Sequence, residues 1–159
     1  MFGLFKTSDL DHPQLGVLGW RRGCWRGEIS LSPYGRVPLV LGGTRKGPDA
    51  QALSQALTLA ENFAAVRHSL QQALFEHYEP YAEAVRAGEL RPDDDGLAEL
   101  SDPAEALRKA SLVAVVVVPL DDEMATELCY EVPWDREHLL GACFRGRQWI
   151  ELCGSTLLP

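Results

Sequence analysis

Long apolar stretches are missing from this sequence. Of its 159 residues 46% are apolar, yet the longest uninterrupted apolar run, residues 112–118, has only seven. A helix needs about 20 consecutive apolar residues to span a bilayer, so a membrane-spanning helix is excluded. Residues 1–6 have no basic residue ahead of their apolar side chains, so no signal peptide is expected. The sequence therefore predicts a cytoplasmic protein with no membrane partner.

Cysteine is scarce and scattered. The four cysteines form no Cys-x-x-Cys pair, and no histidine lies at zinc-finger spacing from any of them. Such thiols are typical of a reducing compartment and exclude a disulfide-stapled miniprotein. The sequence predicts no metal site and no cofactor. The four residues are Cys24, Cys129, Cys143 and Cys153.

Common catalytic motifs are absent as well. The sequence contains no G-x-S-x-G elbow, no P-loop and no G-x-G-x-x-G fingerprint. His68 and His77 are nine residues apart on one predicted helix, which is too far for an i,i+4 metal pair. These absences favour a function other than catalysis.

Basic residues are the minority: 15 Lys and Arg stand against 23 Asp and Glu, for a formal net charge of −8. Residues 49–138 hold six basic and nineteen acidic residues, whereas residues 1–48 hold seven and three. An acidic surface repels phosphate backbones, so nucleic-acid binding is disfavoured. Local nucleic-acid binding through the N-terminal basic residues is kept as a weaker alternative. These are Arg21, Arg22, Arg26, Arg36, Arg45 and Lys46.

What the sequence does contain predicts a single α+β domain over residues 15–159, after a loose lead-in at residues 1–14. Short strands joined by Gly and Pro turns are expected before residue 42. Apolar residues at steps of three and four then predict one long amphipathic helix from about Pro48 to Tyr78, ended or kinked at Pro80.

The C-terminal part predicts strands. Residues 112–118 are apolar on both alternating faces, which is typical of a central strand covered on both sides. Three further strands are expected at residues 124–132, 139–144 and 148–152, after a short helix that ends near Lys109. Because strands and helices segregate, the predicted fold is α+β, with a mostly antiparallel sheet packed against one long helix.

One candidate site lies in the segment from Trp134 to His138. A carboxylate beside an imidazole can orient it and raise its pKa, as general-base or metal-assisted chemistry requires. On a regular strand, however, Asp135 and Glu137 point to one side, and Trp134, Arg136 and His138 to the other. We therefore favour a structural or binding role, and keep a hydrolase or metal-assisted enzyme using Asp135, Glu137 and His138 as the alternative.

A second candidate site lies in the N-terminal hairpin, where Trp20, Arg22 and Trp25 interleave aromatic and cationic side chains. Trp and Arg are enriched at the hot spots of protein interfaces. The competing interpretation is a hairpin whose tryptophans pack on the sheet while its arginines are solvated.

The chain also resembles an uncharacterised bacterial domain family, a domain of unknown function. The resemblance rests on the opening hairpin, Gly19-Trp20 to Trp25-Arg26-Gly27, and on Trp134-Asp135-Arg136-Glu137-His138 before the last hairpin. It covers most of residues 15–154 and implies a small cytoplasmic protein that acts as a partner or immunity-like neutraliser of other proteins. It supplies no reaction and no catalytic residue.

The predicted function is therefore non-enzymatic recognition of a protein partner, by an immunity- or adaptor-like module. A homo-oligomer is left open, because no residue pattern selects or excludes it. The candidate binding residues are Trp20, Arg22, Trp25, Trp134, Asp135, Glu137 and His138.

Overall fold

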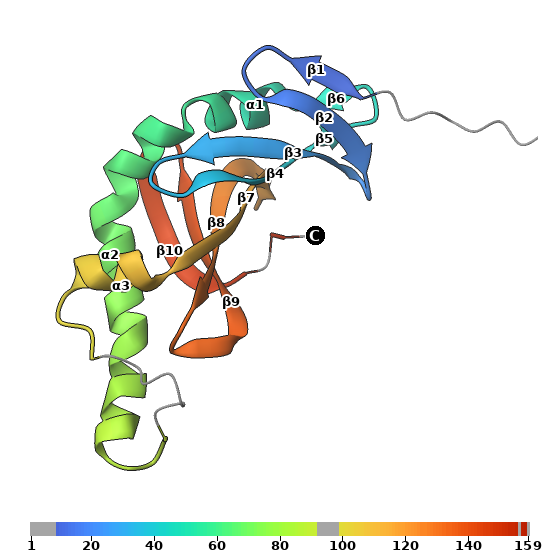
Figure 1. Cartoon of the computed structure of the whole chain (residues 1–159). Coiled ribbons are helices and arrows are strands. Elements are labelled where there is room, and N and C mark those ends of the chain that lie inside the picture. The colour runs from blue at the N-terminus through green and yellow to red at the C-terminus, as the bar shows by residue number, and fades with distance from the viewer. Residues whose placement is uncertain (1–8, 92–98, 156, 159) are drawn as a thin grey trace, which may run out of the picture.

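The computed structural model describes residues 9–91, 99–155 and 157–158 (Figure 1). The strands before the helices are β1 (Leu10–His12), β2 (Gly16–Arg21), β3 (Cys24–Leu31), β4 (Gly35–Leu41), β5 (Gly43–Thr44) and β6 (Gly47–Pro48). The helices are α1 (Ala50–Leu57), α2 (Leu59–Arg86) and α3 (Pro103–Lys109). The remaining strands are β7 (Ser111–Leu120), β8 (Glu123–Val132), β9 (Asp135–Arg145) and β10 (Gln148–Gly154).

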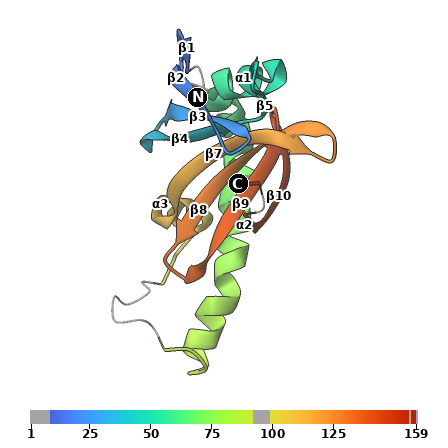
Figure 2. The same cartoon turned by 90° about the vertical axis from the view of Figure 1, so that its right-hand side faces the viewer.

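One eight-stranded sheet organises the fold, in the order β1-β2-β3-β4-β7-β8-β9-β10. Neighbouring strands in it pair antiparallel, except that β4 and β7 pair parallel. A parallel pair needs a crossover connection, and the three helices provide it between β4 and β7. The sheet is strongly twisted, so that β3 runs across the direction of β8 and β9 (Figures 1 and 2). The α+β prediction with a mostly antiparallel sheet is confirmed.

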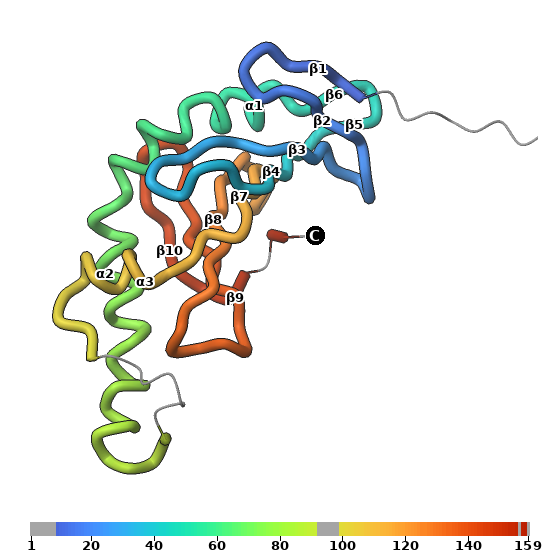
Figure 3. Tube along the Cα trace, viewed as in Figure 1, coloured from blue at the N-terminus to red at the C-terminus, as the bar shows by residue number. Residues whose placement is uncertain are grey.

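The long helix α2 covers one face of this sheet and runs alongside β10, as the chain trace shows (Figure 3). The apolar side chains of α2 that face the sheet are buried. Full burial of one large apolar side chain contributes about 1.5–3 kcal/mol, so this buried stripe is a main source of stability. No described helix is long and apolar enough to cross a membrane. The buried stripe of α2 includes Leu59, Phe63, Val66, Leu70, Leu74, Tyr78 and Ala82.

The helix boundaries differ from the predicted ones. The helix is interrupted at Thr58, whose φ of −101° and ψ of 11° separate α1 from α2. The Thr58 hydroxyl donates to the Ser54 carbonyl and accepts from the Asn62 side chain, so side-chain bonds stabilise the break. The expectation of one unbroken helix up to residue 78 is therefore wrong at this point.

The helix also does not end at Pro80. Pro80 is exposed, and buried Tyr78 and Ala82 continue the apolar stripe on either side of it. An interior proline costs roughly 3 kcal/mol because it removes one backbone hydrogen bond. Packing of the flanking turns against the core offsets that cost.

Residues 10–12, expected in the loose lead-in, form β1 and pair with β2.

The opposite face of the sheet has a smaller apolar cluster. Val115 and Val117 belong to the main core, whereas Ala114 and Val116 face this second cluster, so β7 is covered on both sides as predicted. Leu157 packs against the cluster, and the carboxylate of fully buried Glu127 accepts a 2.7 Å hydrogen bond from the Ser155 hydroxyl.

Candidate functional site

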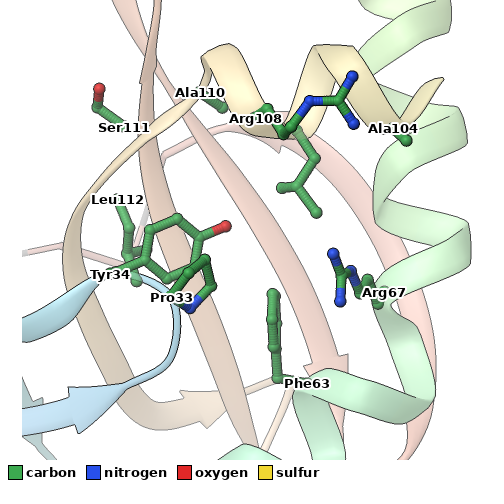
Figure 4. A pocket seen from close by; sticks show the side chains of 10 residues that line it. Pro33, Tyr34, Phe63, Arg67, Ala104, Arg108, Ala110, Ser111 and Leu112 are labelled. Atoms are coloured by element: carbon green, nitrogen blue, oxygen red, sulfur yellow. The ribbon is translucent and has the colours of Figure 1, made fainter. Parts of the chain in front are cut away.

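A pocket of about 410 Å³ opens between the β3–β4 turn, α2, α3 and the start of β7 (Figure 4). We call it the Arg67–Arg108 pocket. This size falls within the range of about 300–1,000 Å³ that is usual for ligand sites. Its lining residues are Pro33, Tyr34, Phe63, Arg67, Ala104, Leu107, Arg108, Ala110, Ser111 and Leu112.

Local hydrogen bonds fix two opposite walls of the pocket. In the β3–β4 turn, the Tyr34 amide donates to the Leu31 carbonyl at 2.7 Å, and Gly35 takes a φ of 76° that favours glycine. In α3, Asp102 caps the N-terminus by accepting from the Glu105 amide at 2.8 Å. The turn fixes one wall of the pocket and the capped helix fixes the opposite one.

The floor of the pocket is aromatic. The rings of Tyr34 and Phe63 meet edge to face, with centroids 6.0 Å apart and planes at 69°. The Tyr34 hydroxyl lies 3.1 Å from that of buried Tyr130. Burial raises the pKa of Tyr34, so its phenol stays protonated at neutral pH. The floor therefore offers an apolar, uncharged surface to a planar or aliphatic group.

Two guanidinium groups border this floor. Arg67 comes from α2 and Arg108 from α3, and both side chains are exposed (Figure 4). Within residues 9–91 and 99–155, neither forms an ion pair with a carboxylate. Guanidinium groups bind carboxylates and phosphates through two parallel hydrogen bonds. The pocket thus combines an apolar floor with two cations suited to an anionic group.

No pattern in the sequence points to this pocket. Its walls come from three separate regions, and each lining residue is ordinary in its own context. The one local signal is that Phe63 and Arg67 stand four residues apart on a helix, which places an arginine beside a core aromatic.

The predicted segment after Trp134 forms a different cluster, built around Asp135. Asp135 is buried at the start of β9 and accepts 2.9 Å hydrogen bonds from the Tyr81 hydroxyl and from His138 Nδ1. The second oxygen of Asp135 lies 3.9 Å from His77 Nε2. Burial raises the pKa of Asp135, but the bonds from His138 and Tyr81 outweigh burial and lower it overall. The carboxylate is therefore ionised at neutral pH.

A bulge brings Asp135 and His138 together. Tyr130 pairs with Leu140 but Val132 pairs with Asp135, so β9 has three more residues than β8 in this stretch. Extra residues rotate the following side chains relative to the ladder. The expectation that Asp135 and His138 point to opposite sides is wrong for this reason.

His77 is held by the neighbouring tryptophan. Trp134 Nε1 donates to His77 Nδ1 at 3.0 Å, so the proton of the neutral ring is on Nε2. Burial lowers the pKa of His77, which favours this neutral form. With Nδ1 accepting from Trp134 and the proton on Nε2, the neutral ring of His77 has no free lone pair for a metal. In the part of the chain that the structure describes, no group of three or more His, Cys, Asp or Glu side chains is arranged to hold a metal ion.

The tryptophans of the predicted sites differ in position. Trp25 and Trp134 are buried in the core, and Trp25 Nε1 donates to the Thr44 carbonyl at 2.8 Å. Trp20 is half-buried against Trp25, with ring centroids 5.7 Å apart. Arg22 is exposed in the β2–β3 turn. Partner contacts by Trp25 or Trp134 would therefore require the core to open.

The two predicted groups do not meet in one site. The β2–β3 hairpin and the start of β9 belong to strands separated by β4, β7 and β8 in the sheet (Figures 1 and 2). Glu137 and His138 are exposed, and Glu137 raises the pKa of His138 slightly by its charge, after the larger effect of Asp135. Among the N-terminal arginines, Arg21 pairs with Asp9 and Arg36 with Glu28, which reduces their basic character.

Comparison with known proteins gives one match. The model of a family described as a domain of unknown function, DUF6985, matches residues 18–156. Neither the search of curated proteins nor that of solved structures finds a match.

Proposed function

The chain belongs to the DUF6985 family of domains of unknown function. We propose that it is a non-enzymatic module that binds a protein partner, and that the Arg67–Arg108 pocket is the contact site.

One observation carries this proposal: two exposed guanidinium groups border an aromatic floor, and in the described residues no carboxylate lies within 4.0 Å of either of them, although Glu105 acts on Arg108 by its charge. The chain has 23 acidic residues, so carboxylates are plentiful elsewhere. Tyr and Arg are among the residues that most often dominate binding energy at protein interfaces. An anionic group of a partner would supply a counter-charge in direct contact with the two guanidinium groups, while an apolar group covers Tyr34 and Phe63.

The test compares two charge-matched double variants. Arg67→Ala/Arg108→Ala removes both cations of the pocket, whereas Arg36→Ala/Arg147→Ala removes two exposed cations elsewhere. Each protein is immobilised and exposed to an extract of source cells, after circular dichroism has verified its fold. We expect a stoichiometric partner on the unmodified protein and on the control, but not on the pocket variant. A partner retained equally by both variants, or no partner at all, would overturn the proposal.

A second candidate function is hydrolysis, and it is favoured by the 2.9 Å hydrogen bond between Asp135 Oδ1 and His138 Nδ1. This bond leaves Nε2 as the basic atom of a ring that is 67% exposed, the arrangement of a general base oriented by a carboxylate. Screening against ester and phosphoester substrates tests it, with His138→Gln as the probe and His68→Gln as the matched control on α2. Turnover that His138→Gln abolishes and the control keeps would establish it, and absence of turnover would remove it.

A further inference from the structure

A second hollow adjoins the Arg67–Arg108 pocket. It measures about 360 Å³ and is lined by Lys109, Ser111, Glu131, Val132, Pro133 and Arg136. Ser111, the first residue of β7, lines both hollows. Arg108 of the first hollow and Lys109 of the second are neighbours at the end of α3. The two hollows therefore lie next to each other at the end of α3 and the start of β7, and we call them together the α3–β7 groove.

The groove reverses the charge of the rest of the chain. Arg67, Arg108, Lys109 and Arg136 line it, against the single acidic side chain of Glu131. The overall formal charge is −8. Basic residues in the last turn of a helix such as α3 also offset its dipole. Arg67 lies inside α2, away from both ends, where the dipole offers no such advantage.

The backbone beside the groove also lacks a neighbour. β7 pairs with β4 only from Val115 onward, so residues 111–114 have no strand on that side in the described sheet. Ser111 is exposed, and Leu112 is half-buried in the pocket lining. An unpaired stretch of strand can accept an extended peptide through main-chain hydrogen bonds.

From these three observations we propose that the α3–β7 groove binds an extended acidic segment of a partner protein. An aromatic or large aliphatic side chain of the segment lies on Tyr34 and Phe63. Carboxylates on either side of it meet Arg67 and Arg108 in one direction and Lys109 in the other. The proposal rests on the proposed function, because it specifies what the partner presents to the pocket.

Other ligands fit the groove less well. A nucleic acid would bring a long row of phosphates toward a chain with a large negative charge, and that repulsion opposes binding. A small organic anion would occupy the first hollow and leave both the second hollow and the free stretch of β7 without a partner. An extended peptide uses all three.

The test is fluorescence anisotropy with three short labelled peptides. The first is acidic with a central phenylalanine, the second has alanine in its place, and the third has lysine in place of every acid. We expect saturable binding of the first peptide only, weakened by added salt because exposed charges are screened. Inorganic phosphate, benzoate and a single-stranded oligonucleotide serve as competitors.

Two charge reversals and one matched control locate the binding. Arg67→Glu and Lys109→Glu are each expected to weaken binding of the acidic peptide about tenfold or more, whereas Arg147→Glu on the exposed β9–β10 turn leaves it unchanged. Arg67→Gln, which keeps a hydrogen-bonding side chain, is expected to have an intermediate effect. Thermal melts verify that each variant is folded.

Each result separates the two proposals. If the extract partner is lost from Arg67→Ala/Arg108→Ala but no acidic peptide binds, the partner module stands and the acidic-segment assignment falls. If Arg67→Glu weakens binding and Lys109→Glu does not, the assignment of the second hollow falls. Benzoate or the oligonucleotide displacing the peptide at equal concentration would replace the acidic segment by a small anion or a nucleic acid.

Discussion

The imidazole of His138 and the carboxylate of Asp135 lie 2.9 Å apart across the bulge in β9, one side chain 67% exposed and the other only 8%. A buried anion thus holds an exposed ring in one orientation. Tyr81 of α2 also stabilises the pair, because its hydroxyl donates to the second carboxylate oxygen of Asp135. This arrangement links the longest helix to the β8–β9 turn and makes the link sensitive to protonation.

The first prediction concerns pH. The hydrogen bond to Asp135 raises the pKa of His138 above 6.5, so the folded protein prefers the protonated ring. The stability from this pair is therefore fully present below pH 6.5 and is lost as the pH rises through the raised pKa. Thermal unfolding of the native protein and of His138→Gln, from about pH 5 to about pH 9, measures it. We expect the difference in melting temperature to shrink as the pH rises.

Neighbouring groups have to be separated from this effect. Tyr81 and His77 face the pair from α2, and Glu137 acts on it from β9. Asp135→Asn provides the check, because it should lower the pKa of His138 in a proton NMR titration. An unchanged titration would show that Asp135 does not stabilise the protonated ring.

The second prediction separates core tryptophans from surface ones. Trp25 is 2% exposed and Trp20 is half-buried, although they are neighbours in the same hairpin. Replacing a buried tryptophan by alanine removes its packing and leaves a cavity, so Trp25→Ala is expected to cost about 3–5 kcal/mol. Trp20→Ala is expected to cost less, as measured by urea unfolding. Equal losses would contradict the burial difference on which this expectation depends.

The third prediction concerns Gly141 on β9. A Cβ atom there would lie 2.5 Å from Oε2 of Glu127, whose side chain is fully buried and held by the Ser155 hydroxyl. Gly141→Ala is therefore expected to destabilise the fold by about 1–3 kcal/mol, since Glu127 has little room to move.

Thermal melts of a double-mutant cycle test this contact. If the clash is with Glu127, Gly141→Ala should cost much less in a Glu127→Ala background than in the native one. Additive losses would place the strain elsewhere.

The fourth prediction concerns thiol reactivity. Burial raises the pKa of Cys129 to about 12 and raises that of Cys143 as well, so both remain protonated and shielded. Cys24 and Cys153 are only half-buried. A thiol-specific chromogenic disulfide reagent is expected to modify the half-buried pair first. Modification of Cys129 or Cys143 before unfolding in denaturant would contradict this order.

Local patterns were sufficient for much of the fold. The uninterrupted apolar run 112–118 predicts a strand covered on both faces, and the apolar residues at steps of three and four from about Pro48 to Tyr78 predict the long helix. Both depend on neighbours along the chain. The continuation through Pro80 could not be read in this way, because it depends on packing of the flanking turns against the distant sheet.

The candidate sites were harder to predict for a related reason. The Arg67–Arg108 pocket needs Tyr34 from a turn, Arg67 from one helix and Arg108 from another, and no spacing in the sequence joins them. The contact between Asp135 and His138 joins two residues that the sequence already indicates as candidate site residues. The bulge that brings them to one side arises from how β8 and β9 align, which periodicity alone does not specify.

The parallel junction of β4 and β7 has a consequence for how the chain folds. On either side of it, every strand of the described sheet pairs with its neighbour in the sequence, so two local meanders can form quickly. The junction itself joins residues 39–41 to residues 115–117 and closes a loop that contains all three helices. Loop-closure entropy opposes this step until α2 has packed on both halves. Docking of the two meanders is therefore expected to limit the folding rate.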